Sequence, residues 1–324
     1  MTGGTPSGTL DQMLRAYSDT MVYDRIAKGQ TPRDDVEAVC SAQARGQLVV
    51  YPSVMDVEEL LGQWETRRTD ALLRLRKMRD TVGFSPMLKQ PADLLGEAIL
   101  AYAAGREPPP VTLGAEHQKA MADYAHGILD GDEGIVNEVL PRVVAEVRAM
   151  KAEFPRWWHE ARVRVWDAFP ASERRRVNFP AYFASDAEAW AEDIVRRRFG
   201  AEIADACRAR GLDGLLALRP VRLCIGASMA LVCDTTFGDG VQTSEPRPGD
   251  CYDFWHAIAA SAADVFITDD RPFARRLKQV PIEGLRIVGS LRELLDILEG
   301  VGADSRGVEA GAAPAAAVAE TAPS

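Results

Sequence analysis

The chain has few cysteines and histidines for its 324 residues, and neither type shows the spacing of a zinc or redox site. The cysteines are odd in number, scattered and without a Cys-x-x-Cys pair. This argues against a disulfide framework or a zinc site and is typical of a reducing cytosol. His117, His126 and His159 have no metal-ligand spacing. The five cysteines are Cys40, Cys207, Cys224, Cys233 and Cys251.

Long apolar runs are also absent from the sequence. No uninterrupted apolar segment approaches the roughly 20 residues that span a bilayer. The first ten residues, MTGGTPSGTL, lack the basic and then apolar regions of a signal peptide. We therefore expect a cytoplasmic protein without a membrane partner.

Positive charge is in deficit, because 38 Lys and Arg residues face 48 Asp and Glu residues, for a net charge of −10. This balance argues against a protein that coats polyanions without specificity. It does not exclude a nucleic-acid enzyme, because local basic patches decide contact with phosphate. No Gly-rich phosphate loop or nucleophile motif is present, so no motif supports a phosphohydrolase of small phosphoesters.

The composition is that of a soluble globular protein, with 47% hydrophobic and 27% charged residues, and the length favours about two domains. Residues 1–10 and 301–324 are rich in small residues and proline, and we expect both ends to be disordered. An α/β pattern occupies residues 11–85 and 215–300. Residues 86–214 have a helical pattern and are expected to form an inserted all-α subdomain.

The periodicity predicts strands at 14–17, 48–51, 221–225, 265–267 and 285–288. It predicts helices at 31–45, 64–80, 116–129, 133–154, 155–169, 187–210, 254–263, 271–280 and 291–299. Ser53 is expected to cap a further helix, and Ser290 with Glu293 forms a capping box for the last one. Residues 235–249 are expected to form a loop.

Four acids occupy comparable places, each near the end of a predicted strand or in the helix beside it: Asp19, Glu59, Asp253 and Asp270. Ligands gather outside the carboxyl ends of strands in open α/β sheets. Carboxylates brought together there repel one another unless a cation or a proton lies between them. Mg²⁺ and Mn²⁺ prefer such oxygen ligands and support phosphodiester hydrolysis. The spacing alone leaves a divalent-metal site as a hypothesis.

The order and wording of these segments resemble the PIN-domain nucleases. Members of that family open with a strand ending in Asp-Thr-Asn, and Asp19-Thr20-Met21 stands here. They carry a second acid in a segment like Ser-x5-Glu-Leu-Leu, which Ser53 and Glu59-Leu60-Leu61 fit. The most specific match joins Asp253-Phe254-Trp255-His256, ahead of an alanine-rich helix, to Thr268-Asp269-Asp270 after a strand. The resemblance covers residues 11–85 and 215–300.

This resemblance implies a three-layer α/β/α sandwich with a mainly parallel sheet, and hydrolysis of RNA, less often DNA, that depends on Mg²⁺ or Mn²⁺. It implies that Asp19, Glu59, Asp253 and Asp270 bind metal and that Thr268 supports them by hydrogen bonding. Met21 departs from the frequent asparagine. The helical insertion is foreign to the small toxin members, so neither toxin activity nor an antitoxin partner follows.

Several site residues have a plainer interpretation. Asp19 could simply cap the following helix, and Asp253 could be a helix N-terminal acid. Glu58 and Asp269 are the adjacent alternatives to Glu59 and Asp270, and Asp250 is a reserve ligand. His256, one turn beyond Asp253, is expected to be a hydrogen-bonded support.

The basic residues after Asp270 are the candidate contacts to a phosphate backbone, namely Arg271, Arg275 and Arg276. The segment from Arg156 to Trp166 could stack bases, although tryptophan at helical spacing is more often part of a core.

The sequence favours a metal-dependent ribonuclease. The alternative is a non-catalytic PIN-like scaffold that binds nucleic acid or protein through its insertion. A homodimer is left open.

Overall fold

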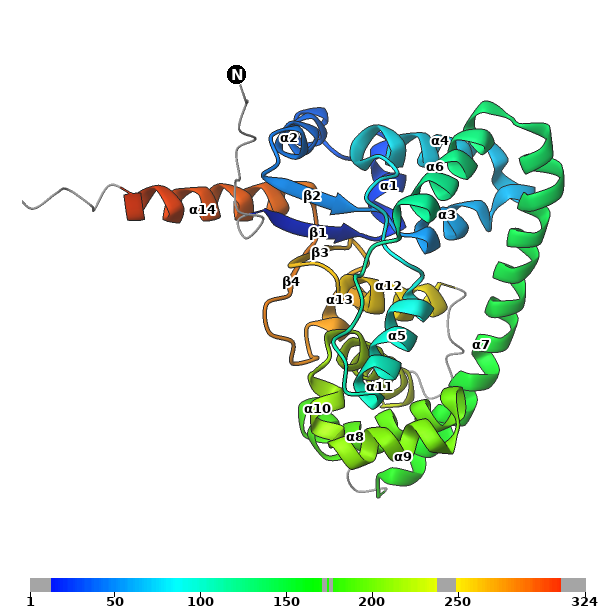
Figure 1. Ribbon diagram of the computed structural model, residues 1–324, viewed down its shortest axis with the longest axis vertical. Coiled ribbons are helices and arrows are strands. Elements are labelled where there is room, and N and C mark those ends of the chain that lie inside the picture. Colours follow the sequence, from blue (N-terminus) through cyan, green and yellow to red (C-terminus); the bar gives the residue numbers. More distant parts are fainter. Residues whose placement is uncertain (1–12, 171–173, 175–176, 238–248, 310–324) are drawn as a thin grey trace, which may run out of the picture.

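The computed structural model describes residues 13–170, 174, 177–237 and 249–309. Its sheet has four strands, all parallel, in the order β2-β1-β3-β4 (Figure 1). The strands are β1 (Leu14–Ser18), β2 (Leu48–Tyr51), β3 (Val265–Ile267) and β4 (Arg286–Val288). The α/β class is as predicted from the sequence.

Helices pack on both faces of this sheet. Alternate residues of a strand point to opposite faces, so neighbouring strand residues join different buried clusters. Ala16 and Ile267 belong to a buried cluster with α2 (Arg33–Ala44) and α14 (Leu291–Glu309). Their neighbours Tyr17 and Phe266 belong to another cluster, with α11 (Arg219–Phe237) and α12 (Asp250–Ala260). The apolar run of β3 is therefore buried on both sides.

The strand order reverses at β1. The chain passes from β1 to β2 on one side, and β3 later pairs with the free side of β1, in register from Ala16 with Val265 to Ser18 with Ile267. The carboxyl ends of β1 and β3 therefore lie side by side. Such a reversal point is the usual ligand position in an open parallel sheet.

The remaining helices are α1 (Thr20–Ala27), α3 (Val54–Leu61), α4 (Trp64–Val82), α5 (Pro91–Ala103), α6 (Ala115–Asp130), α7 (Leu140–Ala168), α8 (Phe179–Phe199), α9 (Ala201–Arg210), α10 (Leu212–Ala217) and α13 (Arg271–Leu277). A π-helical segment, Ile135–Val139, leads into α7. In Figure 1, α7 runs along one side of the molecule from the neighbourhood of α6 to that of α8 and α9.

The structure bears out most predicted elements of the α/β parts. The strands at 14–17, 48–51 and 265–267 are found within one residue, and Ser53 caps α3 through a hydrogen bond from the Asp56 N–H. Ser290 accepts from the Glu293 N–H at the start of α14, as predicted.

The strand predicted at 221–225 is wrong, because these residues lie inside α11. Nearly every residue of this helix from Val221 to Thr236 is buried, so its apolar residues have no sparse helical stripe. Periodicity alone does not separate such a helix from a buried strand. Residues 235–237, predicted as part of a loop, also belong to α11, and 238–248 lie outside the described residues.

Several helix boundaries also differ from the prediction, among them those of α12 (Asp250–Ala260) and α13 (Arg271–Leu277). Pro155 lies inside the continuous helix α7 and does not divide it. The helix predicted over 187–210 is two helices, α8 and α9, which meet at Gly200 with φ of +87°, a left-handed conformation that favours glycine. Residues 301–309, predicted to be disordered, continue α14, whereas the disorder predicted for 1–10 and 310–324 lies outside the described residues.

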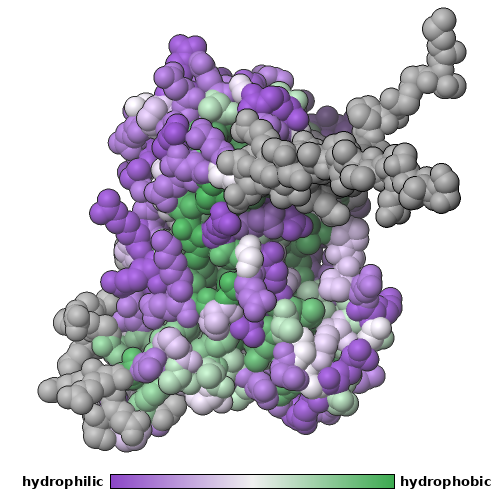
Figure 2. All heavy atoms as spheres, turned by 90° about the vertical axis from the view of Figure 1, so that its left-hand side faces the viewer, coloured by the Kyte–Doolittle hydropathy of each residue, from purple (hydrophilic) through white to green (hydrophobic). Residues whose placement is uncertain are grey.

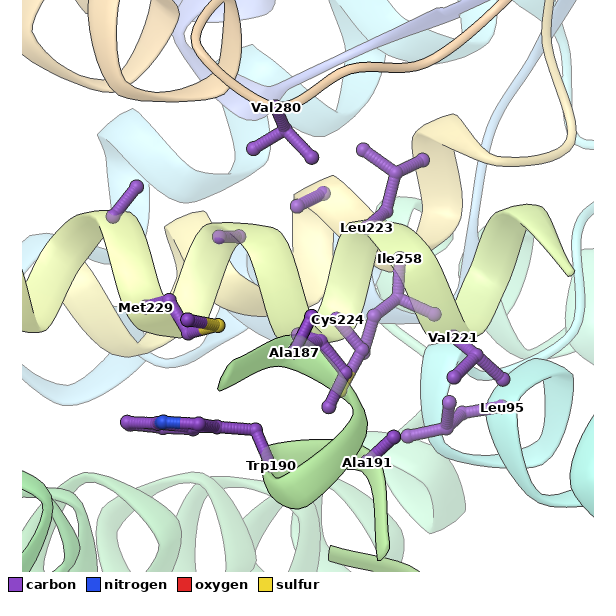
Figure 3. Packing of buried hydrophobic residues seen from close by; sticks show 14 of the residues in the cluster. Leu95, Ala187, Trp190, Ala191, Val221, Leu223, Cys224, Met229, Ile258 and Val280 are labelled. Atoms are coloured by element: carbon purple, nitrogen blue, oxygen red, sulfur yellow. The ribbon is translucent and has the colours of Figure 1, made fainter. Parts of the chain in front are cut away.

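The helices of residues 86–214, predicted as an insertion, share a core with residues 215–300. Helix α11 packs against α12, α5, α7, α8 and α13. Figure 3 shows Val280 on one side of α11 and Trp190 and Ala191 of α8 on the other. Helix α12, which carries Asp253, is therefore held between the sheet and the insertion.

Among the described residues, α11 is the one helix long and apolar enough to cross a membrane by length and composition. Of its 18-residue apolar window, 78% is buried inside the protein. A core helix passes the same test, so this feature is weak evidence for a membrane span.

On the face in Figure 2, hydrophobic residues gather in a central strip with hydrophilic residues around it.

Candidate functional site

Asp19 stands at the carboxyl end of β1, where the chain leaves the sheet to form α1. Its N–H donates to the Ile267 carbonyl at 3.1 Å, and its carboxylate caps α1 by accepting the Met21 N–H at 3.0 Å. The side chain is buried, and burial raises the pKa of Asp19 to about 6. Asp19 therefore caps α1, as the plainer interpretation proposed. The same orientation places its other carboxylate oxygen, Oδ2, next to Thr268, which follows β3.

Thr268 links Asp19 to Asp270. Its hydroxyl donates a hydrogen bond to Asp19 Oδ2 and accepts the Asp270 N–H at 3.2 Å. Asp270 caps α13 by accepting the Phe273 N–H at 2.9 Å. One buried hydroxyl thus joins the Asp19 carboxylate to the backbone of Asp270, about 250 positions later in the sequence.

Asp253 lies in the first turn of α12, close to the same point. Burial, the Asp270 charge and the Asp250 charge raise the pKa of Asp253 to about 8. Arg276 Nη1 approaches Asp253 Oδ2 at 3.7 Å and Asp250 Oδ1 at 3.4 Å. The carboxylates of Asp250 and Asp253 therefore share one guanidinium, and the charge of Asp270 also acts on Asp253 in the first turn of α12.

Glu59 reaches the site from α3. Its Oε2 accepts hydrogen bonds from the Thr20 hydroxyl at 2.7 Å and from His256 Nε2 at 3.0 Å. Burial alone would raise the pKa of Glu59, but the hydrogen bond and charge of His256 hold it below its ordinary value. Burial alone would lower the pKa of His256, but Glu59, Asp56 and Asp19 raise it to about 9. Glu59 and His256 therefore form a pair of opposite charges near neutral pH.

The sequence interpretation missed two residues behind this pair. The Tyr17 hydroxyl donates to Asp56 Oδ1 at 2.8 Å and lies 2.6 Å from His256 Nδ1. Burial raises the pKa of Asp56 to about 7 and keeps that of Tyr17 well above its ordinary value. A signal for Asp56 existed, because Ser53 and Asp56 form a capping box in which Asp56 accepts the Ser53 N–H at 2.7 Å.

The acids next to Asp270 and Glu59 in the sequence, Asp269 and Glu58, have partners outside the candidate site. Asp269 pairs with Arg25, and Glu58 accepts from Gln90 Nε2 at 2.7 Å. Neither acid makes a hydrogen bond or ion pair with the Asp19, Thr268 and Asp270 group in the described part of the chain. The Met21 side chain, at the position where the resemblance expects asparagine, is exposed and does not lie inside the site.

The three predicted phosphate contacts have different environments. Arg276 is buried and pairs with Asp234, Asp250 and Asp253, so its guanidinium is engaged within the protein. Arg275 is exposed but also pairs with Asp234, at 3.1 Å. Arg271 is exposed at the first position of α13. Arg276 therefore orders the acids, and Arg271 is the most accessible of the three to a phosphate.

The four predicted acids lie at one edge of the sheet. Charge interactions relate Asp19 to Glu59 and Asp253 to Asp270, and Thr268 connects the Asp19 carboxylate to the backbone of Asp270. Within the described residues, however, no three His, Cys, Asp or Glu side chains are arranged to hold a metal ion. The donor chemistry fits a hard divalent cation, because the predicted ligands are all carboxylates and Asp253 is held under like-charge repulsion.

The comparisons with known proteins add no relative. No family model matches the chain, and neither a curated protein nor a solved structure matches it.

Proposed function

We propose that the protein is a metal-dependent nuclease of the PIN kind, built on a three-layer α/β/α sandwich and acting on RNA in preference to DNA. One observation carries the proposal. The Thr268 hydroxyl joins the Asp19 carboxylate to the backbone N–H of Asp270 at the reversal point of the sheet, and the charge of Asp270 acts on the Asp253 carboxylate. This is the position and the residue order that the resemblance to PIN-domain nucleases implies.

In this proposal Asp19, Glu59, Asp253 and Asp270 hold Mg²⁺ or Mn²⁺. When bound, such ions supply an activated water and charge stabilisation for the departing oxygen of a phosphodiester. Thr268 fixes the orientation of Asp19 through its hydrogen bond, and His256 does the same for Glu59. The chain's own part is thus to keep four carboxylates close together in spite of their repulsion.

The test is cleavage of a labelled RNA in the presence of Mg²⁺ or Mn²⁺. We expect the wild-type protein to cleave and Asp270→Asn to lose at least about 100-fold in rate, because a ligand is lost with little change in shape. The matched control is Asp269→Asn, since Asp269 pairs with Arg25 and should leave cleavage within about 2-fold. Metal-dependent cleavage that survives both Asp253→Asn and Asp270→Asn contradicts the proposal.

A second candidate function is a non-catalytic scaffold, and one observation favours it. His256 and Arg276 already supply positive charge to Glu59 and Asp253, and no three-residue metal group is formed within the described residues. A calorimetric titration with Mn²⁺ that shows no binding, together with retained binding of RNA or protein, selects this function. A cytoplasmic location, a protein partner for the insertion and a homodimer remain part of either proposal.

A further inference from the structure

A large cavity lies beside the candidate site, between the insertion and α12. It has a volume of about 580 Å³ and is lined by residues of α5, α7, α8, α11 and α12. One wall comes from α7, in the predicted insertion, which contributes Phe154 and Trp157. Another part of the lining comes from α12, in the α/β part, which contributes Phe254 and Trp255.

These four rings form a connected series along the cavity. The ring centroids of Phe154 and Trp157 are 5.5 Å apart, those of Trp157 and Phe254 are 6.1 Å apart, and those of Phe254 and Trp255 are 4.8 Å apart. All four side chains are half-buried. The neighbouring Trp158 differs, because it is fully buried and donates to the Thr235 hydroxyl. Trp158 is therefore a core residue, whereas Trp157 contributes ring surface to the cavity.

The cavity and the acids share helix α12. Phe254 also lines a small hollow with Asp253 and Arg276. Cys251, in the cavity wall, interacts electrostatically with Glu59 and Asp253. Helix α12 therefore carries Asp253 directly before two rings of the aromatic series, Phe254 and Trp255.

The charges of the wall favour an anionic chain. Two guanidinium groups, of Arg197 and Arg198, line the cavity against one carboxylate, of Glu153. Arg198 donates to the Ala92 carbonyl, and Arg197 pairs with acids on α7 and α8. Lys151 of α7 lies close enough to Glu59 to lower its pKa, so the insertion also places a positive charge next to the acids. Among the described residues Arg198 binds a neutral carbonyl oxygen, which does not offset its charge, so this guanidinium suits an anionic chain better than an apolar peptide.

We propose that this cavity binds the unpaired bases of a single-stranded nucleic acid whose backbone lies across the acidic site. Base faces stack on Phe154, Trp157, Phe254 and Trp255, and Arg197 and Arg198 contact the phosphates. A duplex is excluded from the cavity, because its base faces are already stacked. The inference rests on the proposed function for what happens at the acids, but binding itself needs neither metal nor cleavage.

The experiment measures binding of a fluorescein-labelled 12-nucleotide single-stranded RNA by anisotropy, in EDTA, with the full-length protein. We expect Trp157→Ala to weaken binding about 5- to 150-fold and Trp157→Phe to restore most of it, because the ring surface is what binds. The matched control is Trp166→Ala, since Trp166 is exposed on the same helix, stacks on Phe237 and does not line the cavity. The corresponding duplex should bind more weakly than the single strand.

Equal affinity of the wild-type protein and Trp157→Ala, no binding by either, or equal affinity for the duplex overturns the inference. Thermal unfolding of each variant confirms that it is folded. Because cleavage is absent in EDTA, this result is independent of the nuclease test. Trp157-dependent binding without any metal-dependent cleavage would retain the cavity and remove the nuclease.

Discussion

At the residue scale, neighbours of the same chemistry have different roles because their partners differ. Arg275 and Arg276 both pair with Asp234. The Arg275 side chain is 65% exposed, whereas that of Arg276 is 7% exposed and also faces Asp250 and Asp253. The buried guanidinium faces Asp250, whose side chain is only 6% exposed, so solvent cannot replace the positive charge that is lost with Arg276.

We therefore predict that Arg276→Met lowers the free energy of unfolding by about 3–5 kcal/mol. Arg275→Met should cost less than about 1 kcal/mol, because an exposed ion pair is screened by solvent. Urea denaturation of both variants measures the difference. Similar losses for the two would mean that the buried cluster around Asp250 does not depend on Arg276.

At the element scale, α11 packs closely because it carries a glycine where another segment crosses it. A Cβ at Gly226 would stand 2.2 Å from Val280 Cγ1, which is far inside contact distance. Val280 lies just beyond α13, so this contact sets how closely α11 approaches the helix that Asp270 caps.

Gly226→Ala should destabilise the protein by about 1–3 kcal/mol through overpacking, and Val280→Ala in the same chain should relieve part of that cost. Gly96→Ala in α5 is the control, because its nearest neighbour would be Phe199 at an ordinary 3.5 Å. That variant should be neutral or more stable by up to about 1 kcal/mol, since alanine favours a helix. Thermal unfolding measures all three, and an unchanged midpoint for Gly226→Ala would contradict the close approach.

At the scale of the whole molecule, the fold buries several titratable groups near one edge of its sheet. Burial raises the pKa of Asp19, Asp56 and Asp253 to about 6, 7 and 8. His256 also has a raised pKa, of about 9. These four groups therefore bind more protons in the folded protein than in the unfolded chain between pH 5 and pH 9.

The sign of the pH dependence follows. The His256 contribution is fully present below pH 6.5 and is lost as the pH rises through about 9. The three acids are most favourable when protonated, and this advantage is lost as the pH rises from 3.8 through their folded values. We predict that the urea midpoint falls between pH 5 and pH 9, and falls less steeply in Asp253→Asn than in Asp269→Asn. A midpoint that is flat or rises over this range would contradict the buried cluster.

The sequence by itself determined the elements that carry the acids. The strand before Asp270 is a short apolar run, the strand before Asp19 is a short segment that ends at polar residues, and the Ser53 cap is a local hydrogen-bond pattern. Neighbouring residues therefore suffice to predict these features. The sequence did not determine α11, because a helix buried on all sides has no periodicity to reveal it.

Only the tertiary structure decided which side chains share the site. Tyr17 and Asp56 join His256, and Arg276 turns inward to Asp234 and Asp253, through contacts between segments about 20 to 240 positions apart. Such contacts depend on how helices pack around the sheet, and local propensity has no information about them. The same packing opens the aromatic cavity between α7 and α12, two helices that the sequence placed in different domains.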